Sequence, residues 1–522
     1  METRADRPRL AWSTAIFSAA TGLSRVLGLI REIVARGYFG VEGAGINAFT
    51  VAFQVPNLVR ALVADAALSS AFVPVFSELL EKGERKRAWR VASTVFWLLL
   101  LALTALTAAF ILAAPLVMRL FGYDDELAIG LSRVLFPIVA LLGVSGVIVG
   151  ILNSYDEFAI PALTPVAWNL VIILGLVIGV PFADSESAEL YVYAGSILLG
   201  TFVQVLLPLP WLRGRDDRLR VLIDWRDPAV RQVFKLMGPV MLGLGLINFN
   251  AVLGTLFASR LIDKNLAPAA IDAAFRVYML PQGLFSVAVA TVLFPTLSRL
   301  ATRGDLAGFR QTVATGIGQI GFMLVPSSVV CAVLAEPIVR LLYERGEFDP
   351  HETHIVAGAL AAFSVGLAFN GFMLMLNRAF FSLQAPAVPT WVAGGNLALN
   401  AVFFFALYRV GVWGIPLAIS LANIAGTLAL LWLLRRRVGA LGIAAGVSTL
   451  ARVTLASAAL ALVSFAAWWA LDDALGRSFP AQLVSLGTAL ILGSLVYLAA
   501  CRALRVRELS ALLSLRGRFR RS

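Results

Sequence analysis

The stretch FVPVFSELLEKG (72–83) decides the fold, because it returns as LFPTLSRLATRG (293–304) at a constant offset. The matched residues are Pro74 with Pro295, Ser77 with Ser298 and Gly83 with Gly304. Each copy ends a long apolar segment and enters a polar loop, and an even number of apolar segments separates the two. The copies therefore have the same orientation, which indicates parallel repeats, a transporter architecture with a substrate site between the halves.

The composition around these copies is that of a membrane protein. Of 522 residues, 59% are hydrophobic and 14% are charged, whereas soluble domains carry about 45–50% apolar and about 25% charged residues. A membrane span needs about 20 mostly apolar residues. The chain offers fourteen such segments, near 11–38, 45–79, 92–118, 128–152, 159–182, 189–212, 234–259, 268–298, 311–339, 354–377, 387–408, 411–434, 447–471 and 480–501.

These segments predict an all-α polytopic membrane protein with fourteen transmembrane helices. The repeat groups them into an N-terminal lobe of six helices (1–212) and a C-terminal lobe of six (213–437), which starts with a basic cytoplasmic linker. Residues 438–522 then hold two further helices and a basic cytoplasmic tail.

The basic residues explain the net charge of +12. The alternate connections that begin with the N-terminal tail carry 29 of the 43 Lys and Arg residues, and the other connections carry eight. Because short cytoplasmic loops are enriched in Lys and Arg, both termini are predicted to be cytoplasmic. Topology thus accounts for the charge without nucleic-acid binding, and the chain has no phosphate-binding loop of the ATPase type.

Four arginines fall inside predicted spans: Arg25 and Arg31 in the first, Arg60 in the second and Arg276 in the eighth. Charge at this depth is costly and persists where it lines a cavity or has a partner. Two carboxylates, Glu32 and Asp65, lie nearby in sequence, so the site is predicted to be cationic. A guanidinium fork suits a phosphate or diphosphate. The alternative is that each arginine pairs with a carboxylate or with carbonyls freed by Pro56 and Pro281.

Four asparagines form a candidate site for a coupling ion. They are Asn248 and Asn250 in the seventh span and Asn396 and Asn400 in the eleventh. Their amide oxygens suit Na⁺, although hydrogen bonds between helices explain them equally well. No other cofactor and no metal cluster is predicted. The sequence shows no Ser/His/Asp or Cys/His arrangement, so we expect a transporter rather than an enzyme.

Four stretches together resemble the MurJ/MviN family of lipid II flippases over almost the whole chain. They are LSRVLGLIRE (23–32), NAFTVAFQVPNLVRALVADAALSSAFVPVFSE (47–78), GILNSYDEFAIPALTPVAWNL (150–170) and FRVYMLPQGLFSVAVATVLFPTLSRL (275–300). The resemblance implies the fold of the multidrug/oligosaccharidyl-lipid/polysaccharide exporter superfamily in a bacterial cytoplasmic membrane. It also implies alternating access that moves lipid II, an undecaprenyl-diphosphate-linked cell-wall precursor, to the outer leaflet. Membrane lipids are implied as further partners, and the cell-wall synthesis machinery as a candidate one.

The resemblance places the essential arginines of the family on Arg25, Arg31, Arg60 and Arg276, with Glu32 and Asp65 as acidic companions. The chain departs from the family at Asn47, where an aspartate is frequent. Sodium-binding members carry an aspartate in the seventh helix where this chain has Gly254, while Asn396 and Asn400 match the polar pair of the eleventh.

Two other functions fit parts of the pattern. One is a flippase for another polysaccharide lipid, or a cation-coupled exporter of the same superfamily. An exporter of organic cations would present buried carboxylates, so four arginines disfavour it. The other is a scaffold for cell-wall assembly that transports nothing, in which intramembrane arginines would have no purpose.

Overall fold

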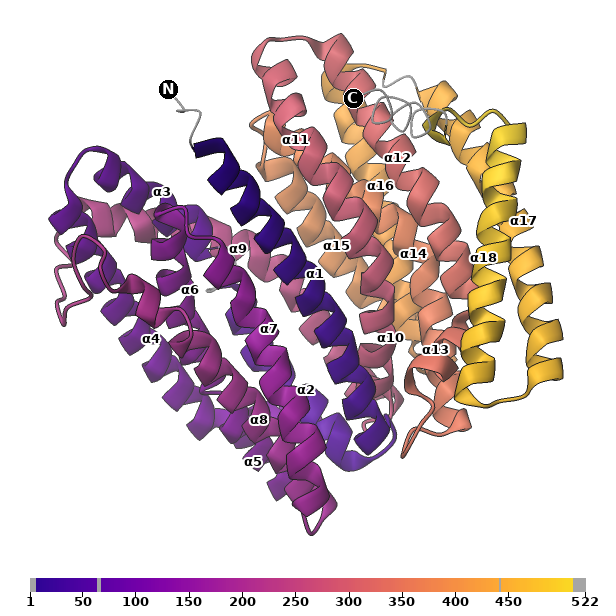
Figure 1. Cartoon of the computed structure of the whole chain (residues 1–522), viewed down its shortest axis with the longest axis horizontal. Helices are drawn as coiled ribbons and strands as arrows, with labels where there is room; N and C mark the ends of the chain where they lie inside the picture. The colour runs from indigo at the N-terminus through magenta and orange to yellow at the C-terminus, as the bar shows by residue number, and fades with distance from the viewer. Residues whose placement is uncertain (1–5, 63–66, 441–442, 510–522) are drawn as a thin grey trace. The chain divides into compact units, whose positions relative to one another are not determined.

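The computed structural model describes residues 6–62, 67–440 and 443–509, and every regular element within them is helical (Figure 1). The chain divides into two compact units, Met1–Ala269 and Ala270–Ser522. Eleven of the described helical segments are long and apolar enough to cross a membrane. The all-α membrane class is therefore confirmed, whereas the count of fourteen spans and the lobe limits at 212 and 437 stay predictions.

The N-terminal unit contains nine α-helices. They are α1 (Asp6–Phe39), α2 (Ala44–Arg60), α3 (Ala67–Glu81), α4 (Arg85–Leu120), α5 (Glu126–Leu135), α6 (Ile138–Ser154), α7 (Ala159–Leu174), α8 (Glu186–Leu206) and α9 (Pro228–Phe257). A π-helical turn and a 3₁₀ turn extend α7 over 175–182, a 3₁₀ turn (Leu209–Leu212) follows α8, and a π-helical turn (Ala258–Ile262) extends α9. The expected span 128–152 is split into α5 and α6 at Pro137, which has no N–H to continue the ladder.

The C-terminal unit contains the remaining α-helices, the first of which begins at the end of the N-terminal unit. They are α10 (Ala267–Pro281), α11 (Val287–Thr302), α12 (Leu306–Val333), α13 (Ala335–Tyr343), α14 (Pro350–Ser382), α15 (Ala387–Leu407), α16 (Gly414–Val438), α17 (Ile443–Leu475) and α18 (Phe479–Ala503). A π-helical turn, Gln282–Ser286, follows Pro281 and joins α10 to α11. Proline cannot donate to the α-helical ladder, and such turns are the usual local consequence.

The two copies of the repeated stretch end in the same turn. Gly83 and Gly304 both have a positive φ, 76° and 70°, which glycine adopts without steric cost. The next residue then closes the helix: Glu84 N–H donates to the carbonyl of Leu79 at 2.9 Å, and Asp305 N–H donates to that of Leu300 at 3.0 Å. These are Schellman-type helix ends. The sequence repeat is thus a repeat of local structure.

The core of the N-terminal unit lies where α3, α4, α6 and α9 meet. Its large fully buried side chains include Phe72, Phe76 and Trp89, and the ring of Phe76 packs edge-on against Trp89 at 6.4 Å. The same unit packs α1 beside α7 (Figure 1). This packing fixes the helix that carries Arg25 and Arg31.

In the C-terminal unit, α14 is the most buried of the long helices, and α16 packs against it. Thr427 Oγ1 donates to the carbonyl of Phe369 at 2.8 Å, and Ser420 Oγ to that of Ala362 at 2.7 Å. The hairpin of α17 and α18 packs on α12, where the hydroxyl of Tyr497 donates to the carbonyl of Phe322 at 2.6 Å. Cys331 and Cys501 are free and buried.

Candidate functional site

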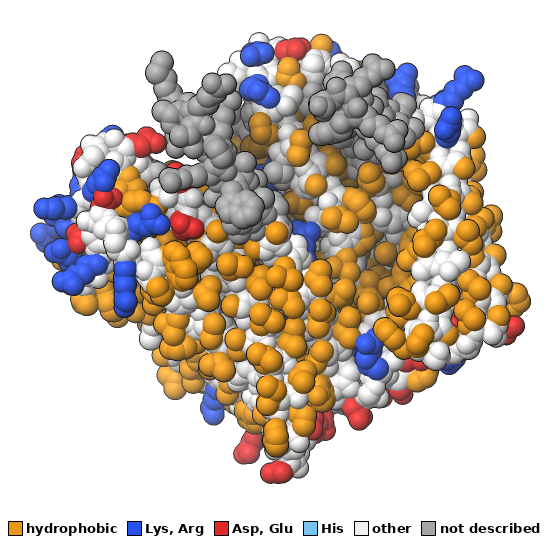
Figure 2. Space-filling view, in the orientation of Figure 1, with side chains coloured by type: hydrophobic (Ala, Val, Ile, Leu, Met, Phe, Trp, Pro, Cys, Tyr) orange, Lys and Arg blue, Asp and Glu red, His pale blue; other side chains and the backbone are white. Residues whose placement is uncertain are grey.

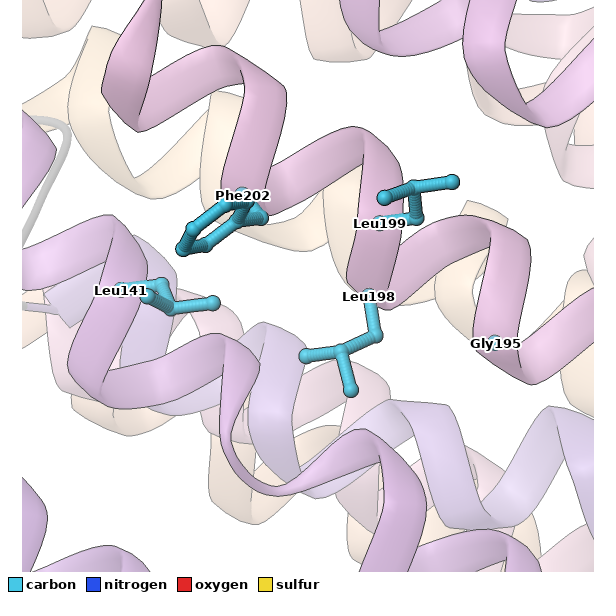
Figure 3. A pocket seen from close by; sticks show the side chains of 5 residues that line it. All are labelled: Leu141, Gly195, Leu198, Leu199 and Phe202. Atoms are coloured by element: carbon cyan, nitrogen blue, oxygen red, sulfur yellow. The ribbon is translucent and has the colours of Figure 1, made fainter.

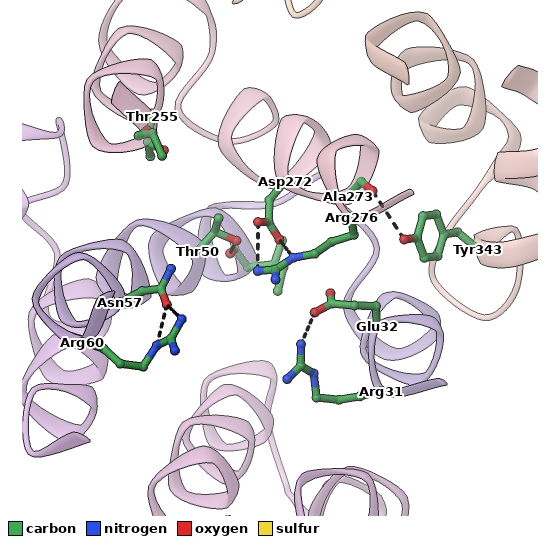
Figure 4. A network of polar contacts seen from close by, with 12 residues as sticks. Arg31, Glu32, Thr50, Asn57, Arg60, Thr255, Asp272, Ala273, Arg276 and Tyr343 are labelled. Atoms are coloured by element: carbon green, nitrogen blue, oxygen red, sulfur yellow. Dashed lines mark hydrogen bonds and ion pairs between the residues drawn. The ribbon is translucent and has the colours of Figure 1, made fainter. Parts of the chain in front are cut away.

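Arg31 is the most enclosed of the four predicted arginines. Its side chain is 10% exposed, and its Nη2 donates to Glu32 Oε1 at 2.5 Å. From α7, Asn169 Oδ1 accepts from Nη1 at 3.2 Å, and the ring of Trp168 lies under the guanidinium at 4.7 Å. A carboxylate, an amide and an aromatic face thus hold the cation, while its buried Nε has no partner among the described residues. Figure 4 shows the pair with Glu32.

Asn169 joins α7 to α1 at this point. Its Nδ2 donates to the carbonyl of Ser24 at 3.4 Å and to that of Pro165, one turn earlier in α7, at 2.9 Å. The side chain of Asn169 is buried and therefore needs these partners. Asn169 and Trp168 position Arg31, and sequence reasoning missed both. Both residues belong to the stretch 150–170 that resembles the family. Their distance in sequence from Arg31 is the reason that the contact with it was not predicted.

Arg25 lies on α1 six residues before Arg31, and its side chain is exposed. At 100° per residue the two arginines point about 120° apart, so one face of α1 cannot present both. Glu32 follows Arg25 by seven residues and so lies on the same face of α1. Its side chain is buried against Arg31. Asp65, the second predicted carboxylate, lies outside the described residues.

Arg60 closes α2 and is half-buried. Asn57 Oδ1, one turn earlier, accepts from its Nε at 3.1 Å and from its Nη2 at 3.0 Å (Figure 4). α2 continues through Pro56 to this point, and residues 63–66 are not described. Asn57 was not predicted, although its spacing of three residues from Arg60 puts both on one helix face.

Arg276 belongs to α10 in the C-terminal unit. Asp272, one turn before it, accepts from Nη2 at 3.1 Å and from Nε at 3.4 Å (Figure 4). The two side chains are 34% and 25% exposed, so this fork is open to a further ligand. Sequence reasoning missed Asp272, although the i, i+4 spacing was a usable signal.

Asn47 is fully buried at the start of α2, where it works as a structural clasp. Its Nδ2 lies 2.8 Å from the carbonyl oxygens of Val41 and Gly43 and 2.6 Å from that of Asn265. Its Oδ1 accepts the N–H of Ala269 at 2.8 Å. One carboxamide therefore ties the α1–α2 loop to the residues that enter α10. An ionised aspartate there would have no proton to donate to these carbonyls.

The four asparagines of the candidate ion site fall into separate units, Asn248 and Asn250 on α9 and Asn396 and Asn400 on α15. The Oδ1 atoms of Asn250 and Asn400 are buried with no partner among the described residues. Asn396 Nδ2 contacts the sulfur of Met373 at 3.6 Å. Among the described residues, no three His, Cys, Asp or Glu side chains cluster as metal ligands do.

A shallow apolar groove lies on the N-terminal unit, and none of the four arginines lines it. Leu141 of α6 and Gly195, Leu198, Leu199 and Phe202 of α8 line it (Figure 3). It presents no charged or hydrogen-bonding side chain, so it can take hydrocarbon but not a diphosphate.

The sequence profile of the family described as lipid II flippase MurJ matches residues 36–484. The chain belongs to the MurJ family. A probable lipid II flippase MurJ of Vibrio cholerae is 31% identical over 425 residues, which cover 77% of this chain and 79% of that protein. The lipid II flippase MurJ of Burkholderia cenocepacia is 29% identical and covers 80% of this chain and 83% of its own length.

Solved structures agree on the fold. A lipid II flippase MurJ in an inward closed conformation superposes with a TM-score of 0.76 over 93% of this chain and 98% of its own, at 24% identity. An inward-facing multidrug resistance MATE family transporter of the MOP superfamily reaches a TM-score of 0.67 at 20% identity, over 82% of this chain and 98% of its own. This chain therefore has the transporter fold that the sequence predicted, and it is a multi-pass protein of the inner membrane.

Proposed function

We propose that this protein is a lipid II flippase, which moves the undecaprenyl-diphosphate-linked precursor from the cytoplasmic to the outer leaflet for cell-wall synthesis. The observation that carries the proposal is the match to the MurJ family over 36–484, joined to the four arginines that fall inside spans predicted from the sequence. The cargo demands a cationic path for the diphosphate, while its hydrocarbon tail can stay in lipid. The protein transports its cargo unchanged and is not an enzyme.

Within this function, Arg60 and Arg276 are the proposed contacts of the diphosphate. Arg60 is half-buried against a neutral amide, and Arg276 forms a fork with Asp272 that is one third exposed. A diphosphate can compete for such guanidinium groups through bidentate, charge-assisted hydrogen bonds. Arg31 is held on three sides, so its proposed role is to keep positive potential at the site, whereas Arg25 is exposed and available to a headgroup.

The decisive experiment measures which leaflet holds lipid II in cells depleted of this protein. Cells complemented with the native chain should expose lipid II on the outer leaflet, and cells with Arg60→Ala or Arg276→Ala should not, at equal membrane levels. Arg303→Ala is the matched control, because Arg303 is an exposed arginine in the α11–α12 turn. Growth support by both arginine variants without flipping would favour the scaffold function instead.

Orientation and energy complete the proposal. The excess of Lys and Arg in alternate connections supports cytoplasmic termini.

The energy source follows from the charge of the empty carrier. Its fixed positive charges respond to an inside-negative potential, worth about 2.3 kcal/mol per full charge per 100 mV. We therefore propose that the membrane potential drives return of the empty carrier, with Na⁺ at Asn248, Asn250, Asn396 and Asn400 as the alternative. Proteoliposomes with potential and sodium gradient imposed separately distinguish the two: flipping by sodium alone overturns coupling to potential.

A further inference from the structure

The linker between α8 and α9 exposes apolar side chains that a cytoplasmic loop would normally hide. In RLRVLIDWR (218–226) the exposed fractions are 83% for Val221, 47% for Ile223 and 66% for Trp225. Three large apolar side chains close together on a nine-residue segment form a continuous patch rather than scattered surface residues. Such a patch indicates contact with a partner or a membrane.

The linker is not a free loop, because α4 holds it through its backbone. Arg220 N–H donates to Ser93 Oγ at 3.1 Å, and Trp97 Nε1 donates to the carbonyl of Arg220 at 2.9 Å. Asp224 N–H donates to Thr94 Oγ1 at 3.1 Å. These bonds fix residues 220–224 alongside little more than one turn of α4, and the apolar side chains are left pointing outward.

The place of attachment sets the depth of the segment. α4 begins with basic residues, of which Arg90 is the last, and then carries no charge until Arg119. Residues 93–97 therefore lie where α4 enters the membrane, about 12 Å or more along the axis from Arg85. Tryptophan is enriched at this level of membrane proteins. The lipid-facing surface continues from here along α4, where Leu101 is 54% exposed.

Arginines flank the apolar patch on both sides. Arg218 and Arg226 are exposed, and neither forms an ion pair with a residue that the structure describes. Figure 2 shows Lys and Arg side chains gathered at the end of the N-terminal unit that holds the α3–α4 turn. Guanidinium groups beside apolar anchors match the surface of a leaflet, which offers phosphates above hydrocarbon.

We propose that residues 218–226 bind the adjacent membrane leaflet, with Val221, Ile223 and Trp225 at the boundary of headgroups and acyl chains. Arg218 and Arg226 then bind the phosphates of anionic phospholipids. The occupant is lipid rather than a protein, because the patch is continuous with the lipid-facing surface of α4 and lies at the depth of the headgroups. Anionic lipid thereby holds the linker on α4 and stabilises the N-terminal unit.

Depth is tested by spin labelling of the full chain in nanodiscs of phosphatidylcholine and phosphatidylglycerol. A label on Ile223→Cys should be more accessible to oxygen than to a water-soluble nickel complex. A label on Lys86→Cys, exposed in the first turn of α4, should show the reverse. Cys331 and Cys501 are buried and leave a low labelling background. If the label at 223 is as accessible to the nickel complex as the label at 86, the proposal is overturned, and the segment faces a protein partner or solvent instead.

Headgroup choice is tested by the thermal midpoint of the protein in detergent with added phosphatidylglycerol or phosphatidylcholine. Phosphatidylglycerol should raise the midpoint of the native chain more, and the double variant Arg218→Gln with Arg226→Gln should lose at least half of that difference. The control removes equal charge from the last turn of α11 and the residue after it, by Arg299→Gln with Arg303→Gln, and should keep the full difference between the two lipids. Equal loss in both double variants, or no difference between the lipids, overturns the anionic-lipid site.

Discussion

Arg31 and Glu32 are neighbours in sequence that form a buried ion pair, with Nη2 and Oε1 2.5 Å apart and side-chain exposures of 10% and 8%. Adjacent residues on a helix point 100° apart, so the pair forms only because the long arginine side chain turns back toward the carboxylate. Breaking such a pair leaves an uncompensated buried charge, whereas removing both partners is far less costly.

The first prediction separates stability from transport at this pair. Arg31→Gln should destabilise the protein by up to about 3–5 kcal/mol, the usual cost of breaking a buried ion pair by removing one of its members. The double variant Arg31→Gln with Glu32→Gln should recover most of the unfolding free energy, measured by denaturation in detergent. If Arg31 supplies positive potential to the site, flipping stays low in the double variant. Recovery of flipping together with stability would assign Arg31 a structural role only.

The second prediction concerns Arg276. Arg276→Lys keeps the charge but loses the fork, so lipid II should bind roughly 10–100-fold more weakly, as expected for one charge-assisted hydrogen bond of about 1.5–3 kcal/mol. Asp272→Asn leaves every donor of Arg276 in place and should retain transport. Binding of diphosphate-containing lipid to the purified variants measures both. An equal loss in the two variants would mean that the contact between Asp272 and Arg276 serves the helix rather than the cargo.

The third prediction is that Asn47→Asp destabilises this chain. The carboxylate would face the carbonyls of Val41, Gly43 and Asn265 without a proton to donate. A buried polar group left without partners costs about 1–3 kcal/mol. The thermal midpoint should fall, and it should recover in part at acidic pH, where the carboxyl group regains one donor. A midpoint equal to that of the native chain at neutral pH would contradict the clasp.

The fourth prediction tests the repeated turn. Gly83→Ala and Gly304→Ala should each cost about 1–2 kcal/mol, because a Cβ is strained at φ of 76° and 70° although nothing lies within 4 Å of it. Gly238→Ala is the control, since Gly238 also has open space but lies within α9. Unequal effects of the two turn variants on the unfolding free energy would show that the two turns do not contribute equally to stability.

The fifth prediction is a pH dependence at the end of the linker. Asp227 caps α9 and accepts from Arg87 Nε and Nη2, both at 3.0 Å, which lowers the pKa of its carboxyl group below the ordinary 3.8. A lowered folded-state pKa contributes stability above the unfolded pKa, which is lost as pH falls through the folded value. Docking of this end should therefore persist at pH 5 and fail only below about pH 4.

Hydrogen exchange of peptides covering 220–232, corrected for intrinsic rates, measures that docking. In Asp227→Asn the amide hydrogens of these peptides should exchange faster than in the native chain at neutral pH, because the free energy of local opening falls by about 1 kcal/mol. Its protection should also change little with acid. Early opening of the native linker between pH 6 and 5 would assign the contact to another group.

The sequence predicted the elements of this fold well, because apolar length and charge-free stretches alone specify membrane helices. The repeat predicted the matching turns at Gly83 and Gly304. The arginines were found because charge inside a span is rare. Their partners were mostly missed: Asn169 lies 138 residues from Arg31, and no local spacing connects them. Asp272 was missed as well, although its i, i+4 relation to Arg276 was a readable signal. The split at Pro137 was missed because apolar composition runs through it.

The clasp of Asn47 also constrains how the protein is made. Its acceptor in Asn265 and its donor in Ala269 are synthesised last in the N-terminal unit, and Ala269 follows Asn47 by 222 residues. At about 5–20 residues per second, the ribosome needs ~10–45 s to produce them. During that interval the start of α2 is already in the membrane with a buried amide that lacks its final partners. The first helices must therefore wait, shielded by lipid or by the insertion machinery, until the seventh predicted span has been inserted.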